Sequence, residues 1–210
     1  MFAQNYASFY DLCNTDKSYK KEIEFVYRWA DKPKWVFDVG AGTGNYWKYY
    51  PKGTYVLGID KSGAMASQNK NIICGDITKH KQTGRFDCAT ALFDVINYIP
   101  RHGWWKNLPL ESGTYWVFDI WDKKKVDKQG FEKTIKVMKN SRRTITPIRY
   151  DGESVDLEIR VEGEDFFFTE KHRMYLHSHD EIKRFCGKEF KVVDVKPTRR
   201  WQTWYLCKRR

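Results

Sequence analysis

Three glycines on alternate positions follow an apolar run that ends at Asp38, within VFDVGAGTGNYW. At Gly40, Gly42 and Gly44 the backbone can turn sharply and approach a ligand closely, because no Cβ blocks a positive φ or the contact itself. A dinucleotide fingerprint needs its third glycine one place later, at Asn45, so the spacing disfavours an NAD site. The segment predicts a strand, a ligand-binding turn and then a helix.

Two later strand-like runs also end in acids, TYVLGID at Asp60 and NIICGD at Asp76. An acid at the end of the second strand of a βαβ unit can accept hydrogen bonds from both hydroxyls of a ribose. Taken alone, each acid is better explained as a helix cap or a turn residue. Three acids at three successive strand ends, with the glycine turn on the first, favour a binding site instead.

The elements that must position these groups alternate along the chain. FDCATALF and GTYWVFDIW supply a fourth and a fifth apolar strand. Strands alternating with short helical segments form a parallel sheet, whose ligand site lies at the carboxyl ends of the strands. Ser178 and Glu181 form a capping box that starts a helix. KEFKVVDVK and TWYLCKR are expected to be the last two strands, paired as an antiparallel hairpin at the sheet edge.

The segments DVGAGTG, GIDKSGAM, CGDI and FDCATALFDVINYI, in this order and spacing, resemble the class I S-adenosylmethionine-dependent methyltransferases over about residues 35–100. The resemblance implies a Rossmann-like α/β fold, with a mostly parallel sheet and an antiparallel last strand. It also implies S-adenosylmethionine as cofactor and S-adenosylhomocysteine as product. The cofactor-binding residues that it implies are Tyr10, Tyr19, Asp38, Gly40, Ala41, Gly42, Gly44, Asp60, Lys61, Met65, Asp76, Ile77, Leu92 and Phe93.

Each part of the cofactor has its own expected contacts. The three glycines pack against the amino acid part, and Asp60 takes the ribose hydroxyls. Met65 covers one face of the adenine, while Asp76 and Ile77 contact its edge. Leu92 and Phe93 border the methionine portion, with core packing as the competing explanation for both.

The two ends of the chain carry a narrower likeness. YASFYDLCNTDKSYKKEIEFV and FFFTEKHRMYLHSHDEI are similar to segments of small-molecule N-methyltransferases that act on amino sugars and similar amines. The likeness implies that residues 1–30 form a helical segment over the cofactor, with Tyr10 and Tyr19 near its carboxylate end. Packing explains Tyr19 equally well, because it starts an apolar stripe of helical spacing.

An amine acceptor must be neutral to attack a methyl group, and histidine is the side chain best matched to accept its proton near neutral pH. His172 is the candidate base, because it matches an E-x-H pattern of the same subgroup; a structural role is the alternative. Asp94 and Asn97 follow the fourth strand, where methyltransferases commonly orient the acceptor, although Asp94 could equally cap a turn. His177 and His179 are explained by capping and surface roles.

Residues 131–175 change pattern and alternate apolar and polar positions, with DG and EG as turn signals. This pattern predicts an insertion of antiparallel β-hairpins. After the fifth strand, such an insertion would sit over the open edge of the cofactor pocket. There it could form a lid or the surface of a homodimer.

The 210 residues fit a single domain over 1–210. No stretch approaches the roughly 20 apolar residues of a membrane helix, and the start lacks the features of a secretory signal. Five cysteines, odd in number and without a C-x-x-C pair, indicate neither a disulfide framework nor a metal site. We expect a cytoplasmic protein without membrane association.

The formal net charge of +11 raises the expectation of nucleic acid binding. Much of it lies in DKKKVDKQGFEKTIKVMKNSRR, where the acids between the lysines favour a solvated face. FDVINYIP lacks the element that sequence-specific DNA amino-methyltransferases carry at this strand end, an Asn or Asp followed by two prolines and an aromatic residue. A small-molecule substrate is therefore favoured; the alternatives are an RNA- or protein-directed methyltransferase and a non-catalytic cofactor-binding protein.

Overall fold

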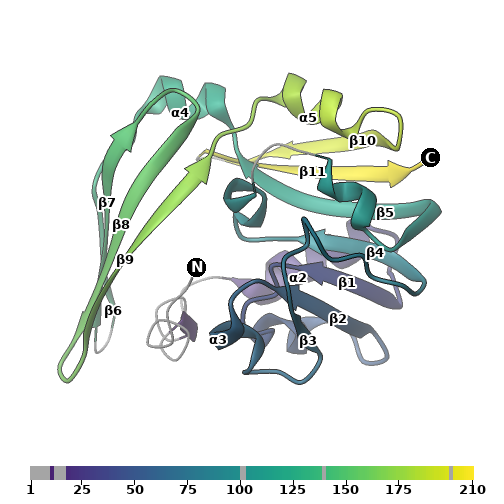
Figure 1. Ribbon diagram of the computed structural model, residues 1–210, viewed down its shortest axis with the longest axis horizontal. Coiled ribbons are helices and arrows are strands. Elements are labelled where there is room, and N and C mark those ends of the chain that lie inside the picture. Colours follow the sequence, from purple (N-terminus) through teal and green to yellow (C-terminus); the bar gives the residue numbers. More distant parts are fainter. Residues whose placement is uncertain (1–9, 12–17, 100–102, 139–140, 199–200) are drawn as a thin grey trace.

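The computed structural model describes residues 10–11, 18–99, 103–138, 141–198 and 201–210. Two sheets organise the chain: a seven-stranded sheet in the order β10-β11-β5-β4-β1-β2-β3, and a four-stranded sheet in the order β6-β7-β8-β9 (Figure 1). The strands of the larger sheet are β1 (Trp35–Val39), β2 (Tyr55–Asp60), β3 (Ile72–Cys74), β4 (Phe86–Ala91), β5 (Leu110–Trp121), β10 (Phe190–Pro197) and β11 (Gln202–Arg209).

The larger sheet is mostly parallel, as predicted. The β1–β2, β1–β4, β2–β3 and β4–β5 pairs are parallel. β11 is antiparallel to both β5 and β10, so the last two strands form the predicted hairpin at the sheet edge. The carboxyl ends of β1, β2, β3, β4 and β5 therefore meet along one edge.

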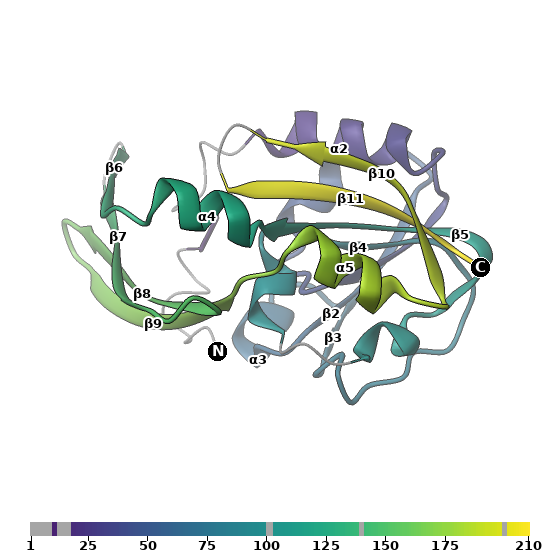
Figure 2. The same ribbon diagram turned by 90° about the horizontal axis from the view of Figure 1, so that it is seen from above.

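Helices cover both faces of this sheet, with α2 and α5 on opposite sides (Figure 2). The helices are α2 (Tyr19–Trp29), α3 (Gly63–Ala66), α4 (Lys123–Gln129) and α5 (His179–Cys186), with 3₁₀ helices η1 (Asn45–Tyr49), η2 (Val95–Tyr98) and η3 (Trp104–Asn107). Neighbouring residues of a strand pack into hydrophobic clusters on opposite faces of the sheet. Val36 packs with α2, whereas Phe37 belongs to the cluster that includes α5. Burying both faces of parallel strands explains why these runs are almost continuously apolar.

Two local predictions about helices had different outcomes. α5 starts with the predicted capping box, in which the Ser178 and Glu181 side chains each bond the other residue's backbone N–H. The segment after the glycine turn forms only the short 3₁₀ helix η1. Its bulky residues Tyr46 and Trp47 are anchored by their side chains to Asp38, which holds the turn tight against the sheet.

The region 131–175 contains the predicted antiparallel hairpins, as a separate sheet of β6 (Thr134–Met138), β7 (Ser141–Tyr150), β8 (Ser154–Gly163) and β9 (Phe167–Tyr175). Asp151 helps to make the turn between β7 and β8, because its side chain accepts backbone N–H bonds from Glu153 and Ser154. Val155, Leu157 and Ile159 alternate with polar residues and are buried on one face. Figure 1 shows this sheet standing as a wall beside the carboxyl edge of the larger one.

No helix within the described ranges combines the length and the apolar character that crossing a membrane requires.

Candidate functional site

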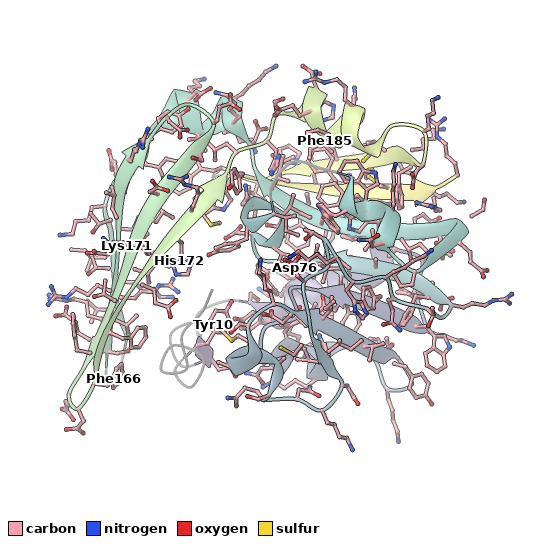
Figure 3. The ribbon with its side chains drawn as sticks, viewed as in Figure 1. Tyr10, Asp76, Phe166, Lys171, His172 and Phe185 are labelled. Atoms are coloured by element: carbon pink, nitrogen blue, oxygen red, sulfur yellow. The ribbon has the colours of Figure 1, made fainter. Side chains whose placement is uncertain are left out.

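A cavity of about 780 Å³ lies between the carboxyl edge of the larger sheet and the buried face of the smaller one. The glycine turn, Asp60 and Asp76 contribute to one wall, and residues of β7, β8 and β9 contribute to the other. On β9, the buried His172 points toward the larger sheet, whereas its neighbour Lys171 is exposed on the opposite face (Figure 3). The insertion thus completes the cavity.

The glycine turn has the backbone that its residues predicted. Gly40, Gly42 and Gly44 have φ of 66°, 59° and 70°. A Cβ built on Gly40 would come within 2.5 Å of Val95, whereas one on Gly42 would meet no atom within 4 Å. Gly40, Ala41 and Gly42 line the cavity, but Gly44 does not; its positive φ instead starts η1.

Asp38 is a buried anchor rather than a cavity residue. It is 1% exposed and accepts hydrogen bonds from the Tyr46 hydroxyl, from Trp47 Nε1 at 2.7 Å and from Thr90 Oγ1 at 2.6 Å. Burial raises the pKa of this carboxyl to about 6, against the lowering effect of these donors. Asp38 therefore lies behind the cavity lining and contacts Tyr46, which does line the cavity.

Three aromatic rings meet at this end of the cavity. Tyr19 stacks on Tyr46 with ring centroids 6.0 Å apart, and Phe93 approaches both edge-on, at 5.1 and 5.0 Å. All three line the cavity. Tyr19 thus takes part in helix packing and faces the cavity, so the two explanations of this residue are compatible.

The N-terminal segment reaches the same cavity through Tyr10 and Asp11. Asp11 accepts a hydrogen bond from the Thr43 hydroxyl at 3.0 Å, and Tyr10 packs against the cluster around Met65. The rest of the predicted covering segment before Ser18 lies outside the described residues.

Asp60 ends β2 and joins two backbone segments. Its two oxygens accept the N–H groups of Gly42 and Ser62, each at 2.8 Å. Burial raises the pKa of this carboxyl, although both backbone bonds oppose the shift. Ser62 then caps α3, which carries the fully buried Met65 into the cavity wall.

Asp76 is held by its neighbours beside the same wall. It pairs with Lys61 at 2.8 Å and accepts both the N–H and the hydroxyl of Thr78. Partial burial alone raises the pKa of Asp76, but these hydrogen bonds outweigh it and lower the pKa to about 2. Lys61, Asp76 and Ile77 all line the cavity, as does Leu92.

The turn after β4 is held by Asp119 and Gln202, neither of which was predicted from the sequence to belong to the site. Phe93 and Asp94, both lining the cavity, have φ of 66° and 69°. The buried Asp119 of β5 accepts both of their N–H groups, at 2.8 and 3.0 Å, and Gln202 of β11 donates to it at 2.7 Å. The signal available was an acid inside the apolar run GTYWVFDIW.

Asn97, predicted to orient the acceptor, does not line the cavity. It is fully buried; its amide nitrogen donates to the Tyr175 carbonyl at 2.6 Å, and its oxygen accepts the Trp121 N–H at 3.0 Å. The side chain therefore connects β5 to the end of β9, which assigns it a structural part.

His172 lies in the cavity wall with a partner at each ring nitrogen. Nδ1 lies 3.1 Å from the Tyr98 hydroxyl, and Nε2 lies 3.3 Å from a carboxylate oxygen of Glu170. Tyr98 also lines the cavity. The predicted base is thus linked to the cavity through a hydroxyl and supported by an acid.

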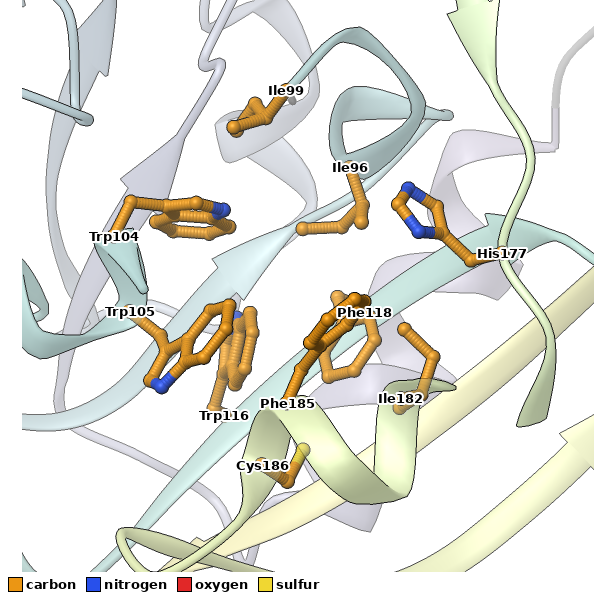
Figure 4. Close-up of a pocket in the computed structure, with 10 residues that line it drawn as sticks. All are labelled: Ile96, Ile99, Trp104, Trp105, Trp116, Phe118, His177, Ile182, Phe185 and Cys186. Atoms are coloured by element: carbon orange, nitrogen blue, oxygen red, sulfur yellow. The ribbon is translucent and has the colours of Figure 1, made fainter. Parts of the chain in front are cut away.

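The other histidines lie elsewhere. His177 is buried rather than at the surface, in a small apolar pocket of about 20 Å³ between Trp104, Trp105 and Phe185 (Figure 4). That volume has room for about one water molecule. His179 contacts the Tyr205 hydroxyl at 3.0 Å, away from the cavity.

The sequence predicted the segment 131–175 that forms the second wall of the cavity, but not the following residues that line it. Its lining residues are Arg143 and Ile145 of β7, Leu157 and Ile159 of β8, and Met174 of β9. The sequence placed the insertion over the open edge of the cofactor pocket, but it did not single out any of these residues as part of the site.

Comparison with known proteins rests on structure, because no family model matches the sequence and no curated protein does either. An S-adenosylmethionine-dependent methyltransferase from Clostridium acetobutylicum is 21% identical with a TM-score of 0.79, over 97% of both chains. DesVI of Streptomyces venezuelae is 16% identical with a TM-score of 0.81, over 98% of both. CalS10, an amino pentose methyltransferase from Micromonospora echinaspora, is 17% identical with a TM-score of 0.76, over 100% of this chain and 98% of that one. The chain therefore has the fold of the S-adenosylmethionine-dependent methyltransferases.

Proposed function

We propose that this protein transfers a methyl group from S-adenosylmethionine to a small-molecule amine. One observation carries the proposal: a single cavity of about 780 Å³ has two chemically different walls. The wall from the larger sheet carries the glycine turn and the strand-end acids. The wall from the smaller sheet carries His172, Arg143 and apolar residues. Such a volume accommodates a nucleoside-sized ligand together with a second small molecule.

The residues of the first wall fit the cofactor. The open space beside Gly42 leaves room for a ligand to approach the backbone. Asp60 retains lone pairs beyond those used by Gly42 and Ser62, and it would bind the ribose hydroxyls. Met65 would cover the adenine, with Asp76 and Ile77 at its edge.

The methionine portion would lie by Leu92 and Phe93. When bound, S-adenosylmethionine supplies a methyl group on a sulfonium, which passes to the acceptor nitrogen as the carbon–sulfur bond breaks and S-adenosylhomocysteine is left. The chain itself must hold the acceptor close, exclude water and take up a proton.

The proton route follows from the contacts of His172. Tyr98 lines the cavity and its hydroxyl contacts Nδ1 of His172, so in this scheme the hydroxyl takes a proton from the acceptor nitrogen while passing its own to Nδ1. Glu170, beside Nε2, stabilises the imidazolium that results. His172 is the base in this scheme, Tyr98 is the group that touches the acceptor, and Glu170 is a positioning residue.

The side chains around the acceptor region favour an amine, which can bind as an ammonium group, over a hydroxyl acceptor. Asp94 supplies a carboxylate to the cavity, and the rings of Tyr98 and Trp121 line it nearby. Negative charge and aromatic faces both attract an ammonium group. The similarity to CalS10, an amino pentose methyltransferase, is consistent with this acceptor class.

The test uses S-adenosylmethionine with a deuterated methyl group and paired acceptors: amino sugars and the matching sugars with a hydroxyl in place of the amine. Mass spectrometry should show label only in the amino member of a pair. Asp60→Ala is the control for cofactor dependence. Label in hydroxyl sugars alone, or only in added RNA with steeply salt-dependent binding, would reject the amine proposal.

The exposed face of the smaller sheet is the surface through which we expect a homodimer to form. Ile135 and Val137 of β6 and Phe167 of β9 are 57%, 77% and 59% exposed. Covering such side chains in a dimer would be favourable. Light scattering of the wild type and of Val137→Lys tests this: a dimer through this face would weaken on substitution.

A further inference from the structure

Two consecutive residues without special backbone freedom adopt the left-handed conformation beside the cavity. Phe93 and Asp94 have φ of 66° and 69°. Non-glycine residues rarely adopt this region, and a pair of them persists only where the surroundings hold them there. The turn therefore requires a device that fixes it.

That device is the carboxylate of Asp119. One oxygen accepts the Phe93 N–H at 2.8 Å, and the other accepts the Asp94 N–H at 3.0 Å. Asp119 is fully buried at the end of β5. Gln202 of β11 donates to the second oxygen at 2.7 Å and also reaches the Asp94 carboxylate at 3.4 Å. Strands from three places in the chain thus converge on one turn.

The charge of this cluster is unusual. Burial, and then the neighbouring Asp94 carboxylate, raise the pKa of Asp119 well above its usual range. The Asp119 carboxyl therefore holds a proton up to a higher pH than an ordinary aspartate does. Burying an acid beside a second acid costs folding free energy, which is consistent with a turn whose conformation matters.

The side chains that this turn carries explain why its conformation matters. The Phe93 ring closes the aromatic group of Tyr19 and Tyr46, and the Asp94 side chain lines the cavity. Val95, the next residue, lies so close to Gly40 that a Cβ there would come within 2.5 Å of it. The turn thus contacts the glycine turn on one side and the acceptor region on the other.

We propose that Asp119, supported by Gln202, is a positioning residue for methyl transfer, which fixes Phe93 and Asp94 so that acceptor and methyl donor are aligned. This rests on the proposed function. Asp119 touches neither ligand; it acts through the two N–H groups that it holds.

The experiment compares Asp119→Asn with the control Asp122→Asn, a change three residues later at the cap of α4, where the carboxylate accepts the Lys124 N–H and the Thr203 hydroxyl but neither N–H of the turn. Asparagine keeps one acceptor oxygen and replaces the other with a donor, so one N–H of the turn loses its partner. Hydrogen exchange of a peptide covering residues 92–98 should accelerate about tenfold or more. The kcat for the acceptor should fall about a hundredfold, because small misplacements are costly in methyl transfer. Asp122→Asn should change neither.

Gln202→Leu provides a second variant if Asp119→Asn does not fold, because Gln202 is only partly buried. It should give a smaller change in the same two measurements. Unchanged exchange over residues 92–98 would show that Asp119 does not hold the turn. Faster exchange with unchanged kcat would reject the positioning role. If the wild type methylates no amine, only the proposed function is rejected. Hydrogen exchange and S-adenosylhomocysteine affinity still test whether Asp119 holds the turn of Phe93 and Asp94.

Discussion

The Asp60 carboxylate accepts the backbone N–H of Gly42 at 2.8 Å, so the acid that ends β2 is bonded directly to the turn that follows β1. Its other oxygen holds the Ser62 N–H at the same distance. One carboxylate therefore fixes two backbone segments of the cavity. A change at Asp60 alters the shape of the site as well as its ligand contacts.

We expect Asp60→Ala to lose about 2–4 kcal/mol of affinity for S-adenosylhomocysteine, because charge-assisted bonds to the ribose disappear. The melting temperature should also fall, since two backbone N–H groups lose their acceptor. Asp60→Asn, which keeps one acceptor, should be intermediate in both. Calorimetry and thermal unfolding measure the two effects; an unchanged affinity would remove Asp60 from the binding site.

Asp76 should set the preference for adenine. If its carboxylate contacts the adenine amino group, S-adenosylhomocysteine should bind about tenfold or more tightly than its inosine analogue, which lacks that amine. Asp76→Ala should reduce this ratio toward one. Lys61→Met is the matched control, because it removes the ion-pair partner and leaves the carboxylate. Equal ratios in wild type and Asp76→Ala would place the adenine elsewhere.

His172→Ala should lower turnover by about 10²- to 10⁴-fold with little effect on cofactor affinity, as expected for loss of a base. The deficit should shrink as pH rises, because an already neutral amine needs no base. Tyr98→Phe should show the same pH trend if its hydroxyl carries the proton, and His179→Gln should behave as wild type. A small deficit that stays constant with pH would assign His172 to positioning.

Asp38 should make stability depend on pH. Its pKa is raised from 3.8 to about 6 in the folded state, so its contribution is fully present below about pH 4 and is lost as pH rises through about 6. Thr90→Val removes a donor that favours the ionised form. Urea unfolding should therefore show a larger cost of Thr90→Val at about pH 8 than at about pH 4. Thr203→Val, at another buried threonine, is the control; an equal cost of Thr90→Val at both pH values would contradict the argument.

Asn97→Ala should act on stability. The substitution leaves the Tyr175 carbonyl and the Trp121 N–H without their partner in a buried place. We expect a loss of about 2–4 kcal/mol in the free energy of unfolding by urea, with a nearly unchanged KM for the acceptor in the folded fraction. The reverse result, normal stability with a raised KM, would restore Asn97 as an acceptor contact.

The fold was predictable because its signals are local. The glycine turn, the apolar strands and the Ser178 capping box each depend on residues close in sequence, and they occur where expected. Asp119 and Gln202 were missed because their partners lie 26 and 83 residues away, and neither spacing nor periodicity reports such a contact. That Asp38 and Asn97 lie outside the cavity lining could not be predicted for a related reason: a polar residue at a strand end can face a ligand or bond buried backbone and side chains, and only packing decides which.

The smaller sheet is built from one continuous stretch of chain, Thr134–Tyr175, whereas most of the groups assigned to the cofactor lie between residues 40 and 94. The two walls are therefore encoded by separate stretches of the chain, which meet where Met65 packs with Ile159 and Val161. A new stretch grafted between β5 and α5 would bring a different acceptor surface to an unaltered methyl donor. In protein engineering terms, we expect chimaeras that exchange this sheet between relatives to methylate different acceptors.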